Sequence, residues 1–209
     1  MKGLFVMKKS KEEAEQTKQE IVDAAKGLFA VKGYAATSMN DICTAAGCSR
    51  GGLYHHFESK EDLFIYLADQ AFTGSWKNWD EEIDDAMTAT EQLYAYADYF
   101  VDTLQKPLNK AGEEFLSRVG PNSEAGQRFL GILTTYMQRF ERLVQNGLDR
   151  GEWKGDNVQE LAMMILGYYS GLSDSIQLMG KGDAKRFYRK ATKLLLEGIQ
   201  KKTISLRGR

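Results

Sequence analysis

The chain has 209 residues, of which 43% are apolar and 27% are charged, and its formal net charge at pH 7 is -1. This composition is typical of a soluble globular protein, and the two cysteines are too few for a disulfide framework or a four-ligand zinc site. No apolar run approaches the roughly 18 residues of a membrane span, and Leu4-Phe5-Val6 is shorter than the apolar core of about 7 residues in a signal peptide. We therefore expect a cytoplasmic protein with no membrane partner.

The charge is unevenly distributed along the chain. Residues 1–60 carry a net charge of +2, residues 61–180 of -11 and residues 181–209 of +8. A DNA-binding surface needs positive charge only within about a Debye length, roughly 10 Å, of the phosphates. The basic C-terminal stretch could touch phosphate, but a solvated helix face beside the acidic middle is the simpler interpretation.

The N-terminal segment combines an arm and a helix. Residues 1–13 are rich in lysine and contain a second methionine, Met7, so we expect a disordered arm and leave the translation start open. A helical stripe follows, and Lys32-Gly33 provides its C-terminal signal. The apolar positions of this stripe are Ile21, Ala24, Ala25, Leu28, Phe29 and Val31.

The stretch from Thr37 to Phe57 predicts two short helices joined by a tight turn. Thr37 or Ser38 can cap the first helix, and Asp41 stands three residues after Ser38, as in a capping box. Gly47 tolerates the left-handed conformation that ends the first helix, and Ser49 then caps the second. This pattern indicates a helix-turn-helix, whose second helix enters the major groove of DNA.

The second of these helices has two distinct faces. Leu53 and Phe57 are four residues apart and can close a small core, whereas Arg50, Tyr54 and His55 lie on the opposite side and can contact DNA. On local spacing alone, an ordinary helical hairpin with an aromatic face remains an alternative. The only two cysteines, Cys43 and Cys48, lie in this stretch, and we favour core packing over redox sensing for both.

The rest of the chain predicts helices joined by short turns and no strand, so we expect an all-α fold. Ser59 caps a helix from about residue 60 to 79, at whose N-terminus Lys60 could hold a phosphate with a free charge. The later helices are expected from Thr88 or Thr90 to Pro107, and over about residues 110–119, 123–151, 157–179 and 183–203.

The motifs of the N-terminal region closely resemble the DNA-binding domain of the TetR family of bacterial transcriptional regulators. The resemblance covers about residues 14–66 and is carried by Gly33-Tyr34, Thr37-Ser38, Asp41-Ile42, Ala46-Gly47, Ser49-Arg-Gly-Gly-Leu-Tyr-His-His-Phe57 and Ser59-Lys60-Glu61-Asp62-Leu63. Two residues depart from the family pattern: Gly52 replaces a small hydroxyl or methyl residue, and Cys48 replaces an aliphatic one. Because glycine costs about 1 kcal/mol of helix propensity, the second helix is expected to be less rigid when free of DNA.

The resemblance implies an N-terminal three-helix DNA-binding domain at residues 14–66, with the helix-turn-helix at about 38–57, and a larger helical ligand-binding and dimerisation domain at residues 67–209. Tyr54, His56 and Lys60 stand at the usual phosphate-contact positions of the family. The candidate DNA contacts are Thr37, Ser38, Asn40, Ser49, Arg50, Gly51, Gly52, Tyr54, His55, His56 and Lys60.

The middle of the chain is rich in aromatic side chains, which either fill a core or line a ligand pocket. For any single residue the core is the simpler interpretation, but so many tyrosines among acidic groups would suit an aromatic or cationic ligand. Asp98, Asp102, Glu113 and Glu114 could supply the countercharge. The candidate ligand-binding residues are Trp76, Trp79, Tyr96, Tyr99, Phe100, Phe115, Tyr136, Phe140, Tyr168 and Tyr169.

The last two predicted helices form the candidate dimer interface. The resemblance implies that they assemble with those of a second copy as a four-helix bundle, while burial within one subunit is the alternative. Two-fold symmetry would require a near-palindromic DNA site. The candidate interface residues are Met164, Tyr168, Gly171, Leu172, Leu194, Leu195 and Gly198.

The sequence argues against an enzyme. It has no phosphate-cradling glycine loop, nucleophile elbow or metal-ligand spacing, and its only histidines, His55 and His56, are adjacent. We therefore predict no cofactor, no metal and no catalytic residue. The expected function is a homodimeric repressor that a small molecule releases from its operator, and a ligand-independent or architectural DNA-binding protein is the alternative.

Overall fold

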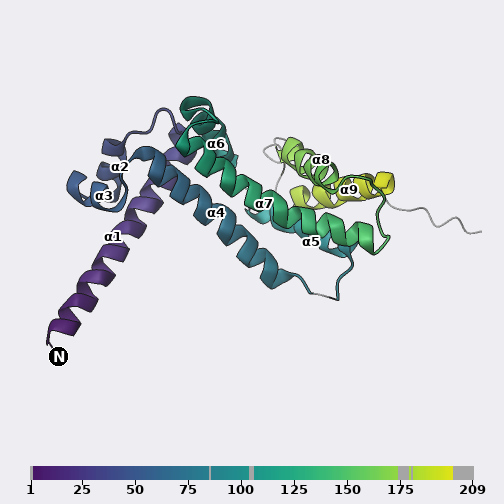
Figure 1. Cartoon of the computed structure of the whole chain (residues 1–209), viewed down its shortest axis with the longest axis horizontal. Helices are drawn as coiled ribbons and strands as arrows, with labels where there is room; N and C mark the ends of the chain where they lie inside the picture. Colours follow the sequence, from purple (N-terminus) through teal and green to yellow (C-terminus); the bar gives the residue numbers. More distant parts are fainter. Residues whose placement is uncertain (1, 85, 104–105, 174–178, 180, 200–209) are drawn as a thin grey trace, which may run out of the picture. The chain divides into compact units, whose positions relative to one another are not determined.

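The computed structural model describes residues 2–84, 86–103, 106–173, 179 and 181–199 (Figure 1). Within these ranges the secondary structure is helical and contains no strand, so the expected all-α fold is confirmed. The helices are α1 (Lys2–Lys32), α2 (Met39–Ala46), α3 (Arg50–His56), α4 (Lys60–Glu82), α5 (Ala89–Thr103), α6 (Lys106–Val119), α7 (Glu124–Asp149), α8 (Val158–Leu172) and α9 (Lys181–Ile199).

The helices group into two compact units. The first unit comprises Met1–Phe72 with Gln105–Ile132, and the second comprises Thr73–Leu104 with Leu133–Arg209. Helices α4 and α7 therefore contribute residues to both units. The sequence places one domain boundary near residue 66, whereas the packing adds α6 and the first turns of α7 to the helix-turn-helix region.

An aromatic core explains why α6 belongs to the first unit. The Phe115 ring lies 5.0 Å from the Tyr34 ring and 4.8 Å from the Phe64 ring, measured between centroids, and Phe129 of α7 lies 5.2 Å from Phe115. The first three of these side chains are at most 2% exposed, and burying aromatic area of this kind contributes strongly to stability.

Glu114 of α6 ties the end of α1 to this core. Its carboxylate accepts a hydrogen bond of 3.2 Å from the Ala35 backbone N–H. At Gly33, whose φ is 80°, an added Cβ would lie 2.6 Å from Glu114 Oε2. The left-handed backbone therefore favours glycine at this position, and any other residue would also displace the Glu114 carboxylate from its bond to Ala35.

Several helices begin at a residue whose side chain caps the first turn by accepting a hydrogen bond from a backbone N–H. Ser123 Oγ accepts from the Gly126 N–H at 3.0 Å at the start of α7, and Asn157 Oδ1 accepts from the Glu160 N–H at 3.1 Å at the start of α8. Before α5, Thr88 Oγ1 accepts from the Glu91 N–H at 3.1 Å, so this predicted start is confirmed.

Three expectations about the helices are wrong. Helix α1 includes residues 2–13, where the composition predicts a disordered arm, and Val31 is 86% exposed rather than part of the core stripe. Helix α6 begins at Lys106 and includes Pro107, which the first turn tolerates because the N–H missing from proline has no intrahelical partner there. The predicted ends of the last two helices, at residues 174–178, 180 and 200–203, lie outside the described residues.

The core of the second unit joins α8 to α9 through buried hydroxyl groups. The Tyr169 hydroxyl bonds to Thr192 Oγ1 at 2.7 Å, and the Tyr188 hydroxyl donates to the Tyr169 carbonyl oxygen at 2.8 Å. At Gly147, an added Cβ would come within 2.5 Å of the buried Trp153 ring. This unit therefore packs at close distance around its aromatic side chains.

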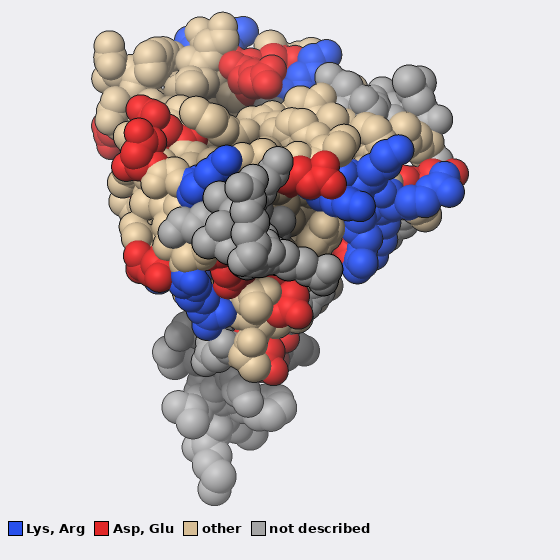
Figure 2. Space-filling model, turned by 90° about the vertical axis from the view of Figure 1, so that its right-hand side faces the viewer, with Lys and Arg blue, Asp and Glu red and all other residues tan. Residues whose placement is uncertain are grey.

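The surface carries both signs of charge. On the face shown in Figure 2, acidic and basic side chains lie among uncharged residues, and in several places they lie next to one another. Among the described helices, none is both long and apolar enough to cross a membrane.

Candidate nucleic-acid interface

A capping box starts α2, as the sequence predicts. Ser38 Oγ accepts from the Asp41 N–H at 3.1 Å, and Asp41 Oδ2 accepts from the Ser38 N–H at 2.9 Å. Hydrogen bonds from the Ser38 backbone and then its hydroxyl lower the pKa of Asp41. Their contribution to stability is present above the ordinary pKa of an aspartate and is lost as the pH falls through the lowered value.

The turn between α2 and α3 has the geometry of a Schellman motif. Gly47 has a φ of 63°, its N–H donates to the Thr44 carbonyl oxygen at 3.3 Å, and the Cys48 N–H donates to the Cys43 carbonyl oxygen at 3.1 Å. In this motif the side chains at the positions of Cys43 and Cys48 make an apolar contact. Burial, and then the neighbouring Cys43, raise the pKa of the Cys48 thiol, which supports packing as the role of both cysteines.

Helix α3 presents the two faces that its spacing predicts. Leu53 is 0% exposed and Phe57, which follows the helix, is 2% exposed, so both are core residues. Arg50 and His55 are exposed on the opposite side, and Tyr54 is 45% exposed. A short helix with a buried apolar face and an exposed polar face is the arrangement that a recognition helix needs.

Gly52 has a local structural explanation. Ser49 Oγ caps α3 by accepting from the Gly52 N–H at 3.1 Å, and a Cβ at Gly52 would lie 3.3 Å from that oxygen. This distance is tighter than an ordinary van der Waals contact. Glycine therefore relieves crowding between the cap and the first turn of the recognition helix.

The structure brings most of the predicted DNA contacts to the surface of α2, α3 and the turn between them. Gly52, His56 and Lys60 are half-buried, while Thr37 is buried. The exposed members of the set are Ser38, Asn40, Ser49, Arg50, Gly51, Tyr54 and His55.

Two of the candidate DNA contacts need correction. Thr37 is 2% exposed and its hydroxyl donates to the Gly33 carbonyl oxygen at 2.8 Å, so its side chain is a structural group. The ammonium of Lys60 does not carry a free charge: it donates to the carbonyl oxygens of Tyr34 and Thr37, both at 2.9 Å, and lies 4.1 Å from the centre of the Tyr34 ring. Burial, and then Arg118, lower the pKa of Lys60.

We expect Lys60→Met to lower the free energy of unfolding by about 2 kcal/mol, because two carbonyl oxygens lose a charged hydrogen-bond donor. Methionine keeps the apolar stem, so the loss reports the ammonium group. Urea denaturation would measure the change, with Lys26→Met on the exposed side of α1 as the control. A variant as stable as the parent but with a smaller salt dependence of DNA binding would instead assign Lys60 to phosphate contact.

His56 lines a hollow of about 420 Å³ in the first unit, together with residues of α1, α4 and α7. Lys18 of α1 lies 4.2 Å from the Tyr66 ring centre, and Arg128 of α7 bonds to Asp62 at 3.0 Å on the same rim. Neither Lys18 nor Arg128 is singled out by sequence periodicity, because both stand on solvated faces of long helices. His56 is therefore half-buried at the rim of this hollow, whereas Arg50, Tyr54 and His55 are exposed.

Most of the candidate ligand-binding residues form one packed aromatic cluster in the second unit. The Tyr96 ring lies 4.9 Å from Phe140, 5.4 Å from Trp79 and 5.9 Å from Tyr169. Phe100, Tyr136 and Tyr168 are partly buried at its margin. The buried members are Trp76, Trp79, Tyr96, Tyr99, Phe140 and Tyr169.

Phe115 does not belong to this cluster. It packs in the first unit between Tyr34 and Phe64, so its inclusion among the ligand-binding residues is wrong. The two carboxylates on α6 are likewise residues of the first unit: Glu113 is exposed there and Glu114 binds the Ala35 N–H.

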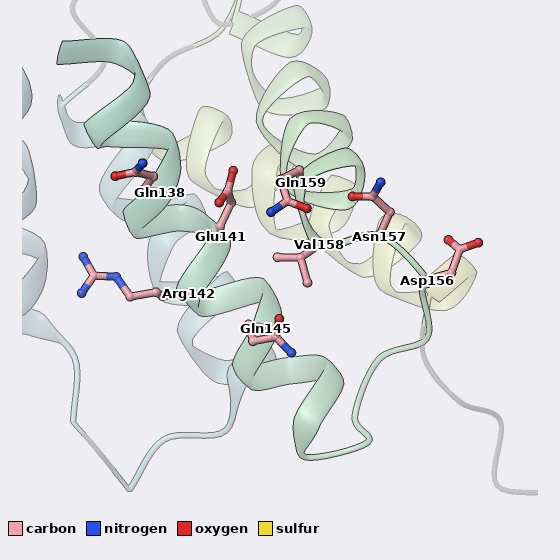
Figure 3. A pocket seen from close by; sticks show the side chains of 8 residues that line it. All are labelled: Gln138, Glu141, Arg142, Gln145, Asp156, Asn157, Val158 and Gln159. Atoms are coloured by element: carbon pink, nitrogen blue, oxygen red, sulfur yellow. The ribbon is translucent and has the colours of Figure 1, made fainter. Parts of the chain in front are cut away.

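A second hollow, of about 510 Å³, lies between α7 and the start of α8 (Figure 3). Its lining is polar and includes none of the candidate ligand-binding residues. Figure 3 shows Glu141 directed toward the start of α8, whereas Arg142 extends away from it. An open, polar hollow of this kind does not have the apolar walls that small-molecule sites usually have.

The candidate dimer residues of α8 and α9 are partly exposed. Met164 is 63% exposed, Leu194 is 58% exposed, and Met163, which the sequence interpretation omits, is 61% exposed. Gly171 and Gly198 are exposed with nothing within 4 Å of an added Cβ, while Tyr168, Leu172 and Leu195 are half-buried. The sequence predicts one apolar face on α8, but its residues lie in two environments. Leu161 and Ile165 face the core of their own subunit, whereas Met164 is exposed.

The chain was compared with known proteins. Residues 21–67 match the family described as bacterial regulatory proteins, tetR family, and residues 73–201 match the C-terminal region of QacR-like proteins. An HTH-type transcriptional regulator of Bacillus subtilis, YfiR, is 28% identical over 176 residues, covering 81% of this chain and 82% of the relative. The HTH-type transcriptional regulator QacR of Staphylococcus aureus is 24% identical over 185 residues, covering 88% and 98%.

A solved structure of a transcriptional regulator shares the fold over most of the chain. The transcriptional regulator FadR from Bacillus subtilis, in complex with stearoyl-CoA, is 25% identical and has a TM-score of 0.70, covering 88% of this chain and 100% of that chain. These relatives are described as transcriptional regulators, not as enzymes. The chain therefore belongs to the tetR family of bacterial regulatory proteins and is a helix-turn-helix DNA-binding transcriptional regulator.

Proposed function

We propose that the protein is a cytoplasmic homodimeric repressor that binds a near-palindromic operator and is released from it by a small molecule bound in the second unit. The observation that carries the proposal is the division of α3 into a buried face, Leu53 with Phe57, and an exposed face, Arg50 with Tyr54 and His55. That exposed face supplies a guanidinium for base edges or phosphates, and a phenol and an imidazole that can donate to the phosphate backbone of DNA.

The exposed apolar side chains of α8 and α9 support dimerisation. Met163, Met164 and Leu194 are each more than half exposed, and large apolar side chains grouped on helices commonly mark an interface. Gly167 and Gly171 leave open space beside α8, so a second helix can approach its backbone closely. Two copies related by a two-fold axis would present two recognition helices to a palindromic site.

The aromatic cluster of the second unit supports the ligand site. It lies within the residues that match the QacR-like C-terminal region, and the similar FadR structure was solved with stearoyl-CoA. A ligand that favours a DNA-incompetent arrangement must itself bind less tightly when operator is present, because the coupling between two sites is reciprocal.

The proposal is tested by selecting operator fragments from genomic DNA with the purified protein and then screening metabolites and drugs by thermal shift and operator competition. We expect discrimination of about a thousandfold or more between operator and scrambled duplex, and at least one compound that both stabilises the protein and releases DNA. Weak sequence dependence would favour the architectural alternative. Stabilising compounds that never release operator would contradict the ligand switch.

A further inference from the structure

The indole nitrogen of Trp76 is a buried hydrogen-bond donor without a partner. Trp76 is 6% exposed, and its Nε1 makes no hydrogen bond to any residue that the structure describes. Buried donors are almost always satisfied, because removing them from water without a partner costs free energy. An unsatisfied group of this kind in a native protein requires an explanation.

The other polar groups nearby are satisfied. Tyr96 and Tyr136 share a hydroxyl–hydroxyl bond of 2.5 Å, and the Tyr169 hydroxyl bonds to Thr192. Trp153, another buried tryptophan of this unit, donates from Nε1 to Thr90 Oγ1 at 3.0 Å. Trp76 therefore stands apart in a cluster whose remaining hydrogen bonds are well made.

The charges around Trp76 oppose a cationic ligand. The guanidinium carbon of Arg139 lies 5.9 Å from the centre of the Trp76 ring, so this ring already has a cation–π contact within the protein. Of the four carboxylates proposed from the sequence as countercharges, the two in this unit are engaged with α9: Asp98 pairs with Arg189, and Asp102 pairs with Lys185. Burial raises the pKa of the Tyr96 and Tyr136 hydroxyls, which therefore stay neutral.

Tyr136 is the side chain whose movement would open the site. Its ring lies 5.0 Å from that of Trp76, and it is half-buried, whereas Trp76 and Tyr96 are more than nine-tenths buried. A planar ligand that takes the place of this ring would contact the faces of Trp76 and Tyr96. The rotation would also break the hydroxyl–hydroxyl bond between Tyr136 and Tyr96, so a polar group of the ligand has to replace it.

We propose that the effector is an aromatic molecule, neutral or anionic, whose carbonyl or carboxylate oxygen accepts the hydrogen bond of Trp76 Nε1 beside Arg139. This inference rests on the proposed function and narrows its ligand class, and it replaces the cationic ligand that the acidic sequence suggests. The apolar body of the ligand stacks in the aromatic cluster. The oxygen satisfies the Trp76 donor, which has no partner among the described residues, and a carboxylate at this place would also lie beside the Arg139 guanidinium.

Four naphthalene probes that share one ring body test the inference by isothermal titration calorimetry of the full-length protein. Acetylnaphthalene and naphthoate carry an acceptor oxygen, ethylnaphthalene carries none, and naphthylmethylammonium carries a cation at the same ring position. We expect acetylnaphthalene and naphthoate to bind about tenfold or more tightly than ethylnaphthalene, because only they satisfy the buried donor. Naphthylmethylammonium should bind most weakly.

Matched variants assign the effect to named atoms. Trp76→Phe keeps an aromatic ring but removes the N–H, so it should abolish the preference for acetylnaphthalene over ethylnaphthalene, while Trp79→Phe should retain it. Arg139→Gln should remove the advantage of naphthoate over acetylnaphthalene. Tyr136→Ala removes the ring that the ligand displaces, so it should tighten binding of both neutral probes by a similar factor. This variant keeps Trp76, so the test does not require that Trp76→Phe folds.

The outcomes separate this inference from the proposed function. Binding of naphthylmethylammonium as tight as that of naphthoate, an unchanged preference in Trp76→Phe, or no binding of any probe would overturn the inference. The repressor proposal is decided independently by operator release in the compound screen. A cation that releases operator would therefore support the ligand switch and refute the acceptor at Trp76.

Discussion

Replacement of Leu53 by alanine is expected to lower the free energy of unfolding by about 3 kcal/mol, the usual cost of removing a fully buried leucine side chain. Leu53 is 0% exposed and is the one residue assigned to the buried face within α3, a helix of 7 residues. A helix this short is not stable by itself in water and depends on tertiary packing. The loss should therefore weaken operator binding as well as stability.

His55→Ala is the matched control, because His55 is an exposed residue of the same helix. Its effect on the free energy of unfolding should stay within about 0.5 kcal/mol. Urea denaturation followed by circular dichroism measures both variants. Equal stability of Leu53→Ala and His55→Ala would contradict the assignment of the two faces of α3.

The parts of the structure that sequence predicts well are those governed by residues close together in the chain. Ser38, Gly47 and Ser49 were assignable because a cap or a left-handed turn depends on one side chain and the three or four residues beside it. The division of α3 into Leu53 and Arg50 faces follows equally from helical periodicity.

The parts that sequence does not predict depend on which helices meet. Periodicity identifies Phe115 as an inward-facing aromatic residue, but not that its partners are Tyr34 and Phe64, about 50 to 80 positions earlier in the chain. For the same reason, the sequence predicts that Lys60 carries a free charge at the start of a helix. In the structure its ammonium donates to two carbonyl oxygens of the loop after α1. The unpaired N–H of Trp76 has no sequence signal, because only the packed structure shows which donors lack an acceptor.

Arg50→Ala is expected to reduce the preference for operator over scrambled duplex by about 10-fold to 100-fold, the usual value of one guanidinium contact to a base edge. Arg50 is the first residue of α3 and is exposed, and the N-terminal residues of a recognition helix are those that reach base edges. A second exposed residue of the helix, Tyr54, provides the contrast. Its hydroxyl can donate to a phosphate oxygen, which exists at every sequence.

Tyr54→Phe should therefore weaken binding to operator and scrambled duplex by the same factor, about 3-fold to 10-fold for one lost hydrogen bond. Fluorescence anisotropy at several salt concentrations distinguishes the two roles. If Arg50 instead holds a phosphate, Arg50→Ala will weaken binding to both duplexes equally and reduce the salt slope by about one. The same titration of Lys60→Met should leave the salt slope unchanged, because its ammonium is bound to the carbonyl oxygens of Tyr34 and Thr37.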